Sequence, residues 1–246
     1  MKTLEGKVAL VTGGSRSIGA AIAKRLAADG ARVAITYGAS AEKAEQVVRD
    51  IERAGGTARA FRADAADATA VREAVTATVD AFGGLDVLVN NAGIAVMKPI
   101  EEFTLEDFDR IVAVNVRAVF VAIQEAVRHL REGGRIINIG SVNSDYVPYA
   151  GGALYAMSKA AIAGLTKAVA RDLGPRGITV TNVQPGPVET DMNPATGAFA
   201  DEARRFMALG RYAKAEEIAD FVAFLASPAS AFITGTGLVI DGGYAA

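Results

Sequence analysis

The sequence predicts an α/β fold, a doubly wound parallel sheet of seven strands with helices packed on both faces. Three features predict it. Short runs rich in Val, Ile and Leu alternate with longer stretches of helical periodicity along the chain. Several of these runs are continuously apolar, as in strands that are buried on both faces. The joints between the elements are short and contain glycine.

Strands are predicted where β-branched residues cluster between turn residues, starting with VALVT, which leads directly into a glycine pair. They are residues 8–12, 32–36, 58–63, 85–91, 135–141, 179–184 and 237–241. Helices are predicted where apolar residues recur three or four positions apart. They are residues 18–29, 41–54, 67–82, 104–131, 153–173 and 215–226.

One segment, residues 186–214, breaks the alternation before the last helix. An insertion after the C-terminal end of a strand is well placed to close over a site as a lid. No repeat, low-complexity tract or linker divides the rest of the chain. We therefore expect one domain over residues 1–246, with a mobile substrate lid near 186–214.

The composition argues against several classes of function. The 246 residues are 51% hydrophobic, enough for a sizeable core, and a net charge of −2 gives no basic face for nucleic acid. The absence of cysteine excludes disulfides and thiolate metal sites, and the only histidine, His129, excludes a multi-histidine site. No run approaches the roughly 20 apolar residues of a membrane span, and no signal-peptide pattern is present. We expect a cytoplasmic protein without metal, nucleic-acid or membrane partners.

The stretch TGGSRSIG, residues 12–19, is typical of a phosphate-binding turn between a strand and a helix. Gly13 and Gly19 would let the backbone approach a pyrophosphate, and the helix would offer free N–H groups. Ser17 occupies the middle position, where glycine is more usual. We expect Ser17 at the helix start with a negative φ, where its hydroxyl suits an N-cap and a phosphate. A positive φ would instead cost about 1–2 kcal/mol.

Tyr155 and Lys159 are four residues apart in a predicted helix, so their side chains share one face. A nearby ammonium favours phenolate, and Lys159 is therefore expected to lower the pKa of Tyr155 from about 10 toward the working range. Such a tyrosine can protonate a developing alkoxide or deprotonate an alcohol.

Other polar and small residues lie at predicted C-terminal strand ends, where open α/β sheets bind ligands. Ser141 ends one strand, and NNAG at 90–93 ends another with residues that allow close approach. Asn115 lies inside an apolar helical stretch, either as a surface amide or as an organiser of water and backbone near Lys159.

With these motifs in this order, the chain resembles the short-chain dehydrogenase/reductase family, including its 3-oxoacyl-(acyl carrier protein) reductases and other ketoreductases. The resemblance runs from GKVALVTGG to IDGGYAA. It implies a Rossmann fold, hydride transfer between NAD(H) or NADP(H) and a carbonyl or alcohol, and a dimer or tetramer that needs no catalytic metal.

The resemblance also implies individual roles. Tyr155 would be the general acid/base, and Lys159 would tune it and hold the nicotinamide ribose. Ser141 would bond the substrate oxygen, and Asn115 would support a proton-relay water. Ser144 is a second candidate for the catalytic serine, because the segment from Ser141 to Tyr155 is one residue longer than the commonest family spacing. The implied cofactor-binding set is Gly13, Ser15, Arg16, Ser17, Ile18, Gly19, Tyr37, Ser40, Asp64, Ala65, Asn91, Ala92, Gly93, Tyr155, Lys159, Pro185, Gly186, Val188 and Thr190.

The end of the second predicted strand indicates NADP(H) as the cofactor. An acidic residue there would bind the ribose diol and repel a 2′-phosphate. The segment carries Tyr37 and Ser40 instead, with no carboxylate before Glu42. Arg16, inside the glycine turn, is placed to pair with the phosphate.

The expected substrate is a moderately apolar ketone or keto-ester, with a 3-oxoacyl thioester as an alternative. The candidate pocket residues are mostly apolar: Val96, Met97, Val147, Tyr149, Met192, Phe199, Phe206 and Met207. A different function also stays open, because GSVNSDYVP and QPGPVETDMNPATG resemble segments of a cyclic-di-GMP-binding biofilm dispersal mediator on this fold. Under that alternative the chain would be a nucleotide sensor.

The predicted helices at 104–131 and 153–173 carry more Ala, Val and Ile than one side of a sheet needs. The C-terminal strand could also pack across a two-fold axis. We expect a homotetramer, with a homodimer as the alternative.

Overall fold

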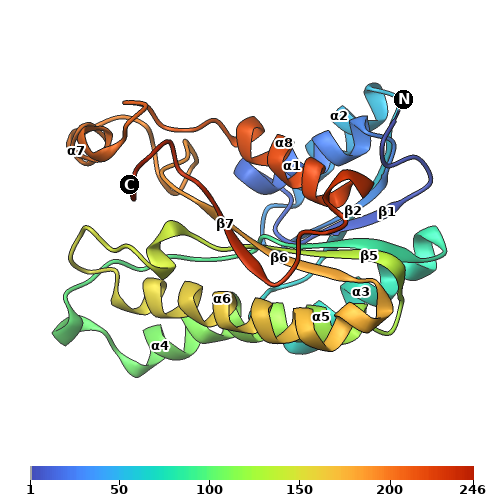
Figure 1. Ribbon diagram of the computed structural model, residues 1–246, viewed down its shortest axis with the longest axis horizontal. Helices are drawn as coiled ribbons and strands as arrows, with labels where there is room; N and C mark the ends of the chain where they lie inside the picture. Colours follow the sequence, from blue (N-terminus) through green and yellow to red (C-terminus); the bar gives the residue numbers. More distant parts are fainter. Residues whose placement is uncertain (1) are drawn as a thin grey trace.

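Seven parallel strands form the centre of the computed structural model, which describes residues 2–246 (Figure 1). The strands are β1 (Val8–Val11), β2 (Arg32–Tyr37), β3 (Thr57–Arg62), β4 (Leu85–Asn90), β5 (Leu130–Ile139), β6 (Thr179–Pro185) and β7 (Thr236–Ile240). Their order in the sheet is β3-β2-β1-β4-β5-β6-β7, and every neighbouring pair is parallel. The predicted fold class is therefore confirmed.

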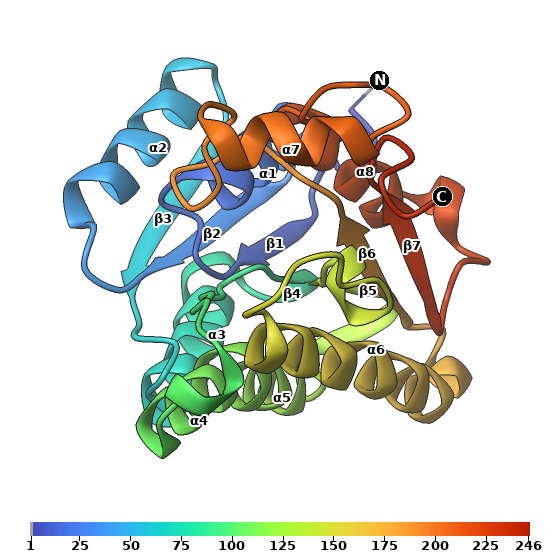
Figure 2. The same cartoon turned by 90° about the vertical axis from the view of Figure 1, so that its left-hand side faces the viewer.

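Helices cover both faces of this sheet (Figures 1 and 2). One layer consists of α1 (Ser17–Ala28), α2 (Ala41–Arg53) and α8 (Ala215–Ala226). The other consists of α3 (Ala68–Phe82), α4 (Leu105–Val112), α5 (Ala118–Ala126) and α6 (Ala153–Leu173). Helix α7 (Ala198–Phe206) lies apart from both layers, beyond the carboxyl edge of the strands.

The continuous apolar run of β1 serves two cores, because successive side chains of a strand point to opposite faces. Ala9 and Val11 pack in the cluster beneath α1, α2 and α8. Val8 and Leu10 pack in the cluster beneath α3, α5 and α6. All four residues are at most 2% exposed, so β1 is fixed from both sides.

The direction of the sheet order reverses between β1 and β4. The chain leaves β1 toward β2 and leaves β4 toward β5, so the two following segments diverge. In open α/β sheets this point leaves a crevice at the carboxyl ends of the strands. The glycine turn after β1 and the segment NNAG after β4 flank this crevice.

The predicted helix at 104–131 is wrong in part. After α4 comes a π-helical stretch, Ala113–Arg117, then α5, which ends at Ala126. Leu130 fits the helical pattern, but it pairs with Leu85 of β4 and begins β5 five residues before the predicted strand start at 135. The register then shifts between Leu85 and Val87, which lets the longer strand continue in regular pairing.

Helix α7 lies in the 186–214 segment, where the sequence predicted no element. Its nine residues are too few for a stable isolated helix, and Ala200 and Ala203 are buried against the rest of the chain. Within residues 2–246, none of the helices combines the length and the apolarity that crossing a bilayer requires.

The predicted negative φ of Ser17 is wrong. Ser17 has a φ of +48° and is the non-glycine residue with positive φ in the described chain. Arg16 is the extended residue that precedes the helix, so the N-cap lies one position earlier than expected. The tight turn from Gly13 into α1 imposes the left-handed conformation, which Ser adopts at a cost of about 1–2 kcal/mol.

Ser17→Gly is expected to raise the free energy of unfolding by about 0.5–1 kcal/mol, because relief of the strain exceeds the extra chain entropy of glycine. In a chain of this size that corresponds to a rise in Tm of about 1–4 °C, measured by calorimetry. Ser17→Ala is the matched control, since alanine keeps the Cβ and the strain. Equal Tm shifts for the two variants would contradict the assignment of strain to φ.

Candidate active site

Helix α6 and the end of β5 bring three of the predicted catalytic residues together. Tyr155 and Lys159 lie in the first two turns of α6, with the Lys159 Nζ 5.6 Å from the centroid of the Tyr155 ring. Ser141 follows β5, and its hydroxyl interacts with Tyr155. The four-residue spacing predicted that Tyr155 and Lys159 share one face of a helix. That Ser141 lies opposite this face depends on the sheet, which brings the end of β5 next to α6.

Lys159 is held at the carboxyl end of the sheet by a hydrogen bond to the strand backbone. Its Nζ donates a hydrogen bond of 2.8 Å to the carbonyl of Ile139, the last residue of β5. The residue is 7% exposed, and burial lowers its pKa to about 8. The ammonium is therefore fixed in position but loses its charge more easily than a surface lysine.

The expectation that Lys159 lowers the pKa of Tyr155 is wrong for this arrangement. Burial raises the pKa of Tyr155, and the interaction with the Ser141 hydroxyl opposes the shift only in part. The cost of placing a phenolate away from water thus outweighs the attraction of the neighbouring ammonium. Tyr155 is held as a protonated phenol, which is the form that can donate a proton.

Asn115 links the segment after β4 to helix α6 through side-chain hydrogen bonds. Its Oδ1 accepts from the backbone N–H of Ile94 at 2.9 Å, and its Nδ2 donates to the carbonyl of Ile94 at 2.9 Å and to Ser158 Oγ at 3.0 Å. It lies in the π-helical stretch, a rare element that often occurs at functional sites. Ser158 was not predicted. Its place next to Lys159 on α6 was the only available signal.

Gly93 shows how close these groups lie to the crevice. A side-chain carbon at this position would be 3.4 Å from Asn115 Oδ1 and 3.7 Å from Lys159 Nζ. The backbone after β4 therefore passes directly beside both polar groups, as the predicted close approach requires.

The structure distinguishes between the two candidate serines. Ser141 is 6% exposed, and its Oγ accepts from the backbone N–H of Asn143 and donates to Asn143 Oδ1, both at 3.1 Å. The Ser144 hydroxyl is bonded elsewhere. It interacts with the carbonyl of Ser141 and with Asp145, and it accepts a hydrogen bond from Gln184. Only Ser141 lies against Tyr155.

The glycine turn and the end of β4 are fastened to each other. Asn91 Nδ2 donates to the carbonyls of Thr12 and Gly13 at 2.9 and 3.1 Å. A side-chain carbon at Gly13 would lie 2.9 Å from the Cα of Ala92, and one at Gly19 would lie 2.4 Å from the carbonyl oxygen of Gly13. Glycine is required at both positions, and Ser15, Arg16 and Ile18 complete the turn around them.

Two threonines that the sequence analysis missed hold this turn in shape. Thr12 Oγ1 accepts from the backbone N–H groups of Asn91 and Ala92 at 2.9 and 3.1 Å, and Thr36 Oγ1 accepts from Gly13 N at 3.0 Å. The sequence signal for both was their place at the C-terminal ends of the predicted strands 8–12 and 32–36. In the structure each follows one of the paired residues Val11 and Ile35.

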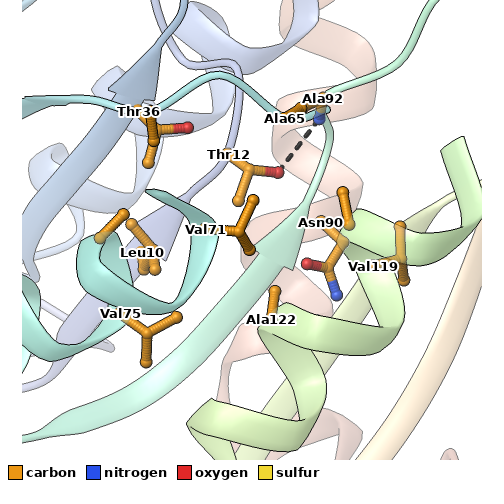
Figure 3. A pocket seen from close by; sticks show the side chains of 13 residues that line it. Leu10, Thr12, Thr36, Ala65, Val71, Val75, Asn90, Ala92, Val119 and Ala122 are labelled. Carbon is orange, nitrogen blue, oxygen red and sulfur yellow. Dashed lines mark hydrogen bonds between the residues drawn. The ribbon is translucent and has the colours of Figure 1, made fainter. Parts of the chain in front are cut away.

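Figure 3 shows a small, mainly apolar pocket lined by residues at and after the ends of β1 and β4 and by α3 and α5, with the Thr12 hydroxyl bonded to the Ala92 N–H. Ala65 and Ala92, both in the expected cofactor set, contribute to its lining. Asp64 lies exposed beside it and accepts from Ala66 N at 2.9 Å. Tyr37 is the last residue of β2, and Ser40 is the N-cap residue of α2. Both therefore lie at the carboxyl edge of the sheet.

The predicted nicotinamide side follows β6. Pro185 is the last residue of β6, and a side-chain carbon at Gly186 would lie 2.8 Å from the Cα of Asp241. Val188 is buried and forms a bridge with Ala213, while Thr190 closes a turn with Asn193. The start of the 186–214 segment is thus anchored to the sheet.

Two of the candidate substrate residues pack against a third, Tyr149. Its ring centroid is 4.8 Å from that of Phe199 and 6.3 Å from that of Phe206, both on α7. The Tyr149 hydroxyl is buried and lies beside the hydroxyl of Tyr244. Val147 is half-exposed and lies near Met97, since both would meet a side-chain carbon at Gly152 within 4 Å.

The remaining candidates separate into exposed and buried residues. Met192 is 59% exposed and Val96 is partly exposed. Met207 is 6% exposed and packs with Tyr212 and Tyr244, so it supports the segment instead of lining a pocket.

Comparison with known proteins places this geometry in a family. A family model described as enoyl-(acyl carrier protein) reductase matches residues 13–245. The chain is 46% identical over 246 residues, and the whole of both chains, to the "Cyclic-di-GMP-binding biofilm dispersal mediator protein" of Escherichia coli K12. 

Two solved structures are still more similar in sequence. A short-chain dehydrogenase/reductase from Serratia marcescens BCRC 10948 is 60% identical, with a TM-score of 0.98 over 99% of this chain and 100% of that one. A short chain dehydrogenase from Burkholderia cenocepacia J2315, solved in complex with NADP, is 59% identical with the same TM-score and coverage. The sheet order, the glycine turn and these matches agree, and the chain belongs to the short-chain dehydrogenase/reductase family.

Proposed function

We propose that the protein is an NADP(H)-dependent oxidoreductase that interconverts a ketone or keto-ester and a secondary alcohol. The observation that carries this proposal is the convergence of Tyr155, Lys159, Ser141 and Asn115 at one end of the crevice, beside Gly93. The nicotinamide cofactor, when bound, supplies the hydride for reduction. The protein's own groups supply the proton, orient the substrate and exclude water from the site.

In this mechanism Tyr155 donates its proton to the alkoxide that develops on the substrate, and the raised pKa keeps that proton available. Ser141 turns its hydroxyl from Asn143 to the substrate oxygen and stabilises the developing charge. Lys159 stabilises the phenolate that remains and lies where a nicotinamide ribose would be held. Asn115 fixes the Ile94 backbone and, through Ser158, the position of α6.

Several features support NADP(H) as the cofactor. Glycines 13 and 19 leave the close approach that a pyrophosphate needs. The end of β2 carries Tyr37 and Ser40 where a carboxylate would repel a 2′-phosphate, and Arg16 lies exposed at the start of α1. The relative from Burkholderia cenocepacia was solved with NADP.

The surroundings of Tyr149 support a moderately apolar substrate with a second oxygen. Phe199, Phe206 and Val147 provide apolar surface, and the buried Tyr149 hydroxyl, beside that of Tyr244, is a polar group within it. A keto-ester would offer this hydroxyl a second acceptor oxygen, which a simple ketone lacks. Residues 186–214, which carry α7, would act as the substrate lid.

A cyclic-di-GMP-binding sensor is the second candidate, favoured by the name of the Escherichia coli relative. Such a sensor needs the crevice but not a protonated phenol beside an ammonium. The catalytic set therefore favours the oxidoreductase.

Exposed apolar side chains support assembly into a cytoplasmic homotetramer. Phe108 and Phe120 are 39% and 49% exposed on α4 and α5, and Phe232 and Val239 are 103% and 57% exposed near and on β7. Two separate apolar surfaces of this kind fit the two interfaces of a tetramer with two-fold axes.

Wild type is expected to oxidise NADPH in the presence of keto-esters, and Tyr155→Phe is expected to lose at least about 100-fold in kcat, because the proton donor is removed. The measurement is absorbance at 340 nm against a panel of ketones and keto-esters. NADPH binding, measured by calorimetry, should persist in Tyr155→Phe. Binding of cyclic-di-GMP by a wild type that turns over no carbonyl would instead support the sensor.

The pH dependence of reduction is expected to follow Lys159. Since its pKa is about 8, kcat/KM should be flat below that pH and fall as the pH rises through it, because a neutral Lys159 no longer stabilises the phenolate of Tyr155. The raised pKa of Tyr155 keeps the acid protonated over this range. In Lys159→Arg, whose charge does not titrate, the residual activity should show no step near pH 8. A wild-type profile without that step would contradict this role.

Light scattering is expected to give a solution mass near 100 kDa, about four times the 25.4 kDa of one chain. Phe120→Glu should reduce the mass to that of a smaller assembly, because it places a charge in an apolar interface. The substitution of exposed Lys24 by Glu is the control. A monomeric wild type would contradict the proposed assembly.

A further inference from the structure

Three charged side chains that come from distant parts of the sequence meet at the adenosine end of the crevice. Asp191, in the 186–214 segment, places its Oδ2 3.3 Å from Lys43 Nζ and 3.9 Å from Arg16 Nη1. The backbone N–H of Asp191 also points to Ser17 Oγ at 3.5 Å. One acidic residue of the lid thus lies between two cations and against the phosphate-binding turn.

Lys43 lies where a determinant of cofactor choice is needed. It is the third residue of α2, the helix that follows β2, and the end of β2 is where an acidic residue would select the unphosphorylated ribose. Ser40, the N-cap of the same helix, makes no side-chain capping bond, so its hydroxyl is not committed to the helix. Lys43, Arg16 and Ser40 together offer the donors of a site for a phosphate monoester.

The carboxylate of Asp191 occupies the position between the two cations. All three charged side chains are more than half exposed, at 56–57%, so these ion pairs hold weakly. A phosphate monoester carries about −1.5 to −2 charges and three acceptor oxygens, against one charge for a carboxylate. The exchange of Asp191 for a phosphate on Lys43 and Arg16 is therefore favourable.

We infer that Lys43 is a second determinant of selectivity for the 2′-phosphate of NADP(H), and that Asp191 is an internal anion that this phosphate displaces. The inference rests on the NADP(H)-dependent function proposed above. Asp191 directly follows Thr190 of the expected nicotinamide side. Displacement of Asp191 by the phosphate removes the ion pairs that join this part of the 186–214 segment to Arg16 and Lys43.

The test uses calorimetric titration with 2′,5′-ADP and with 5′-AMP, which differ by the 2′-phosphate and lack the nicotinamide. Lys43→Gln is expected to weaken 2′,5′-ADP binding by about five- to tenfold, the size of one partly exposed charged contact. Asp191→Asn is expected to tighten it by about two- to fivefold, since exposed ion pairs are weak. Both variants should change 5′-AMP binding less than about twofold.

Lys24→Gln is the matched control, because Lys24 forms a similar pair with Asp50 at 2.7 Å, between α1 and α2 but away from Asp191. It should leave both nucleotides unaffected. In the double variant Lys43→Gln/Asp191→Asn, the gain from Asp191→Asn should shrink, because part of its competition acts through Lys43.

The outcomes that overturn the inference are distinct from failure of the proposed function. Equal effects of Lys43→Gln and Lys24→Gln, or unchanged or weaker 2′,5′-ADP binding in Asp191→Asn, would overturn the inference while the oxidoreductase function stands. Wild type that binds neither nucleotide would overturn both.

Discussion

The link between the turn after β1 and the end of β4 is the contact on which the crevice depends. Asn91 holds the carbonyls of Thr12 and Gly13, while Thr12 accepts two backbone N–H groups from the other side. This exchange satisfies buried backbone groups that the diverging strands would otherwise leave unpaired. It also brings the backbone so close that Gly13 and Gly19 admit no side chain. The phosphate-binding shape is therefore a consequence of the sheet's switch point.

The opposite end of the crevice depends on burial. Lys159 is removed from water and tied to the last carbonyl of β5, and the phenol of Tyr155 is desolvated beside it. Burial disfavours both charged forms, so the pKa of the lysine falls and that of the tyrosine rises. The two values therefore move apart, so that Tyr155 stays a protonated phenol while the pKa of Lys159 comes closer to neutral pH. The same site would lose this property if it were open to solvent.

The 186–214 segment connects the two ends. Its start is tied to β7 by the hydrogen bond from Gly186 N–H to the Ile240 carbonyl. Phe199 and Phe206 bring α7 against Tyr149, and Asp191 reaches the cations of the phosphate turn. Its contacts are a mixture of a few buried apolar residues and exposed ion pairs. Segments of this kind open at low cost, in contrast to strands such as β1 that are buried on both faces.

The sequence by itself determined the fold class, the glycine turn and the shared helix face of Tyr155 and Lys159, because periodicity, glycine spacing and a four-residue helix interval are local properties. It misplaced the start of β5, since the helical position of Leu130 was overridden by pairing with a distant strand. Only the tertiary structure decided the φ of Ser17, the direction of the Tyr155 pKa shift, and the meeting of Asp191 with Lys43. Each of these depends on what surrounds the residue in space: backbone constraint, loss of water, or a charge nearly 150 positions away in the chain.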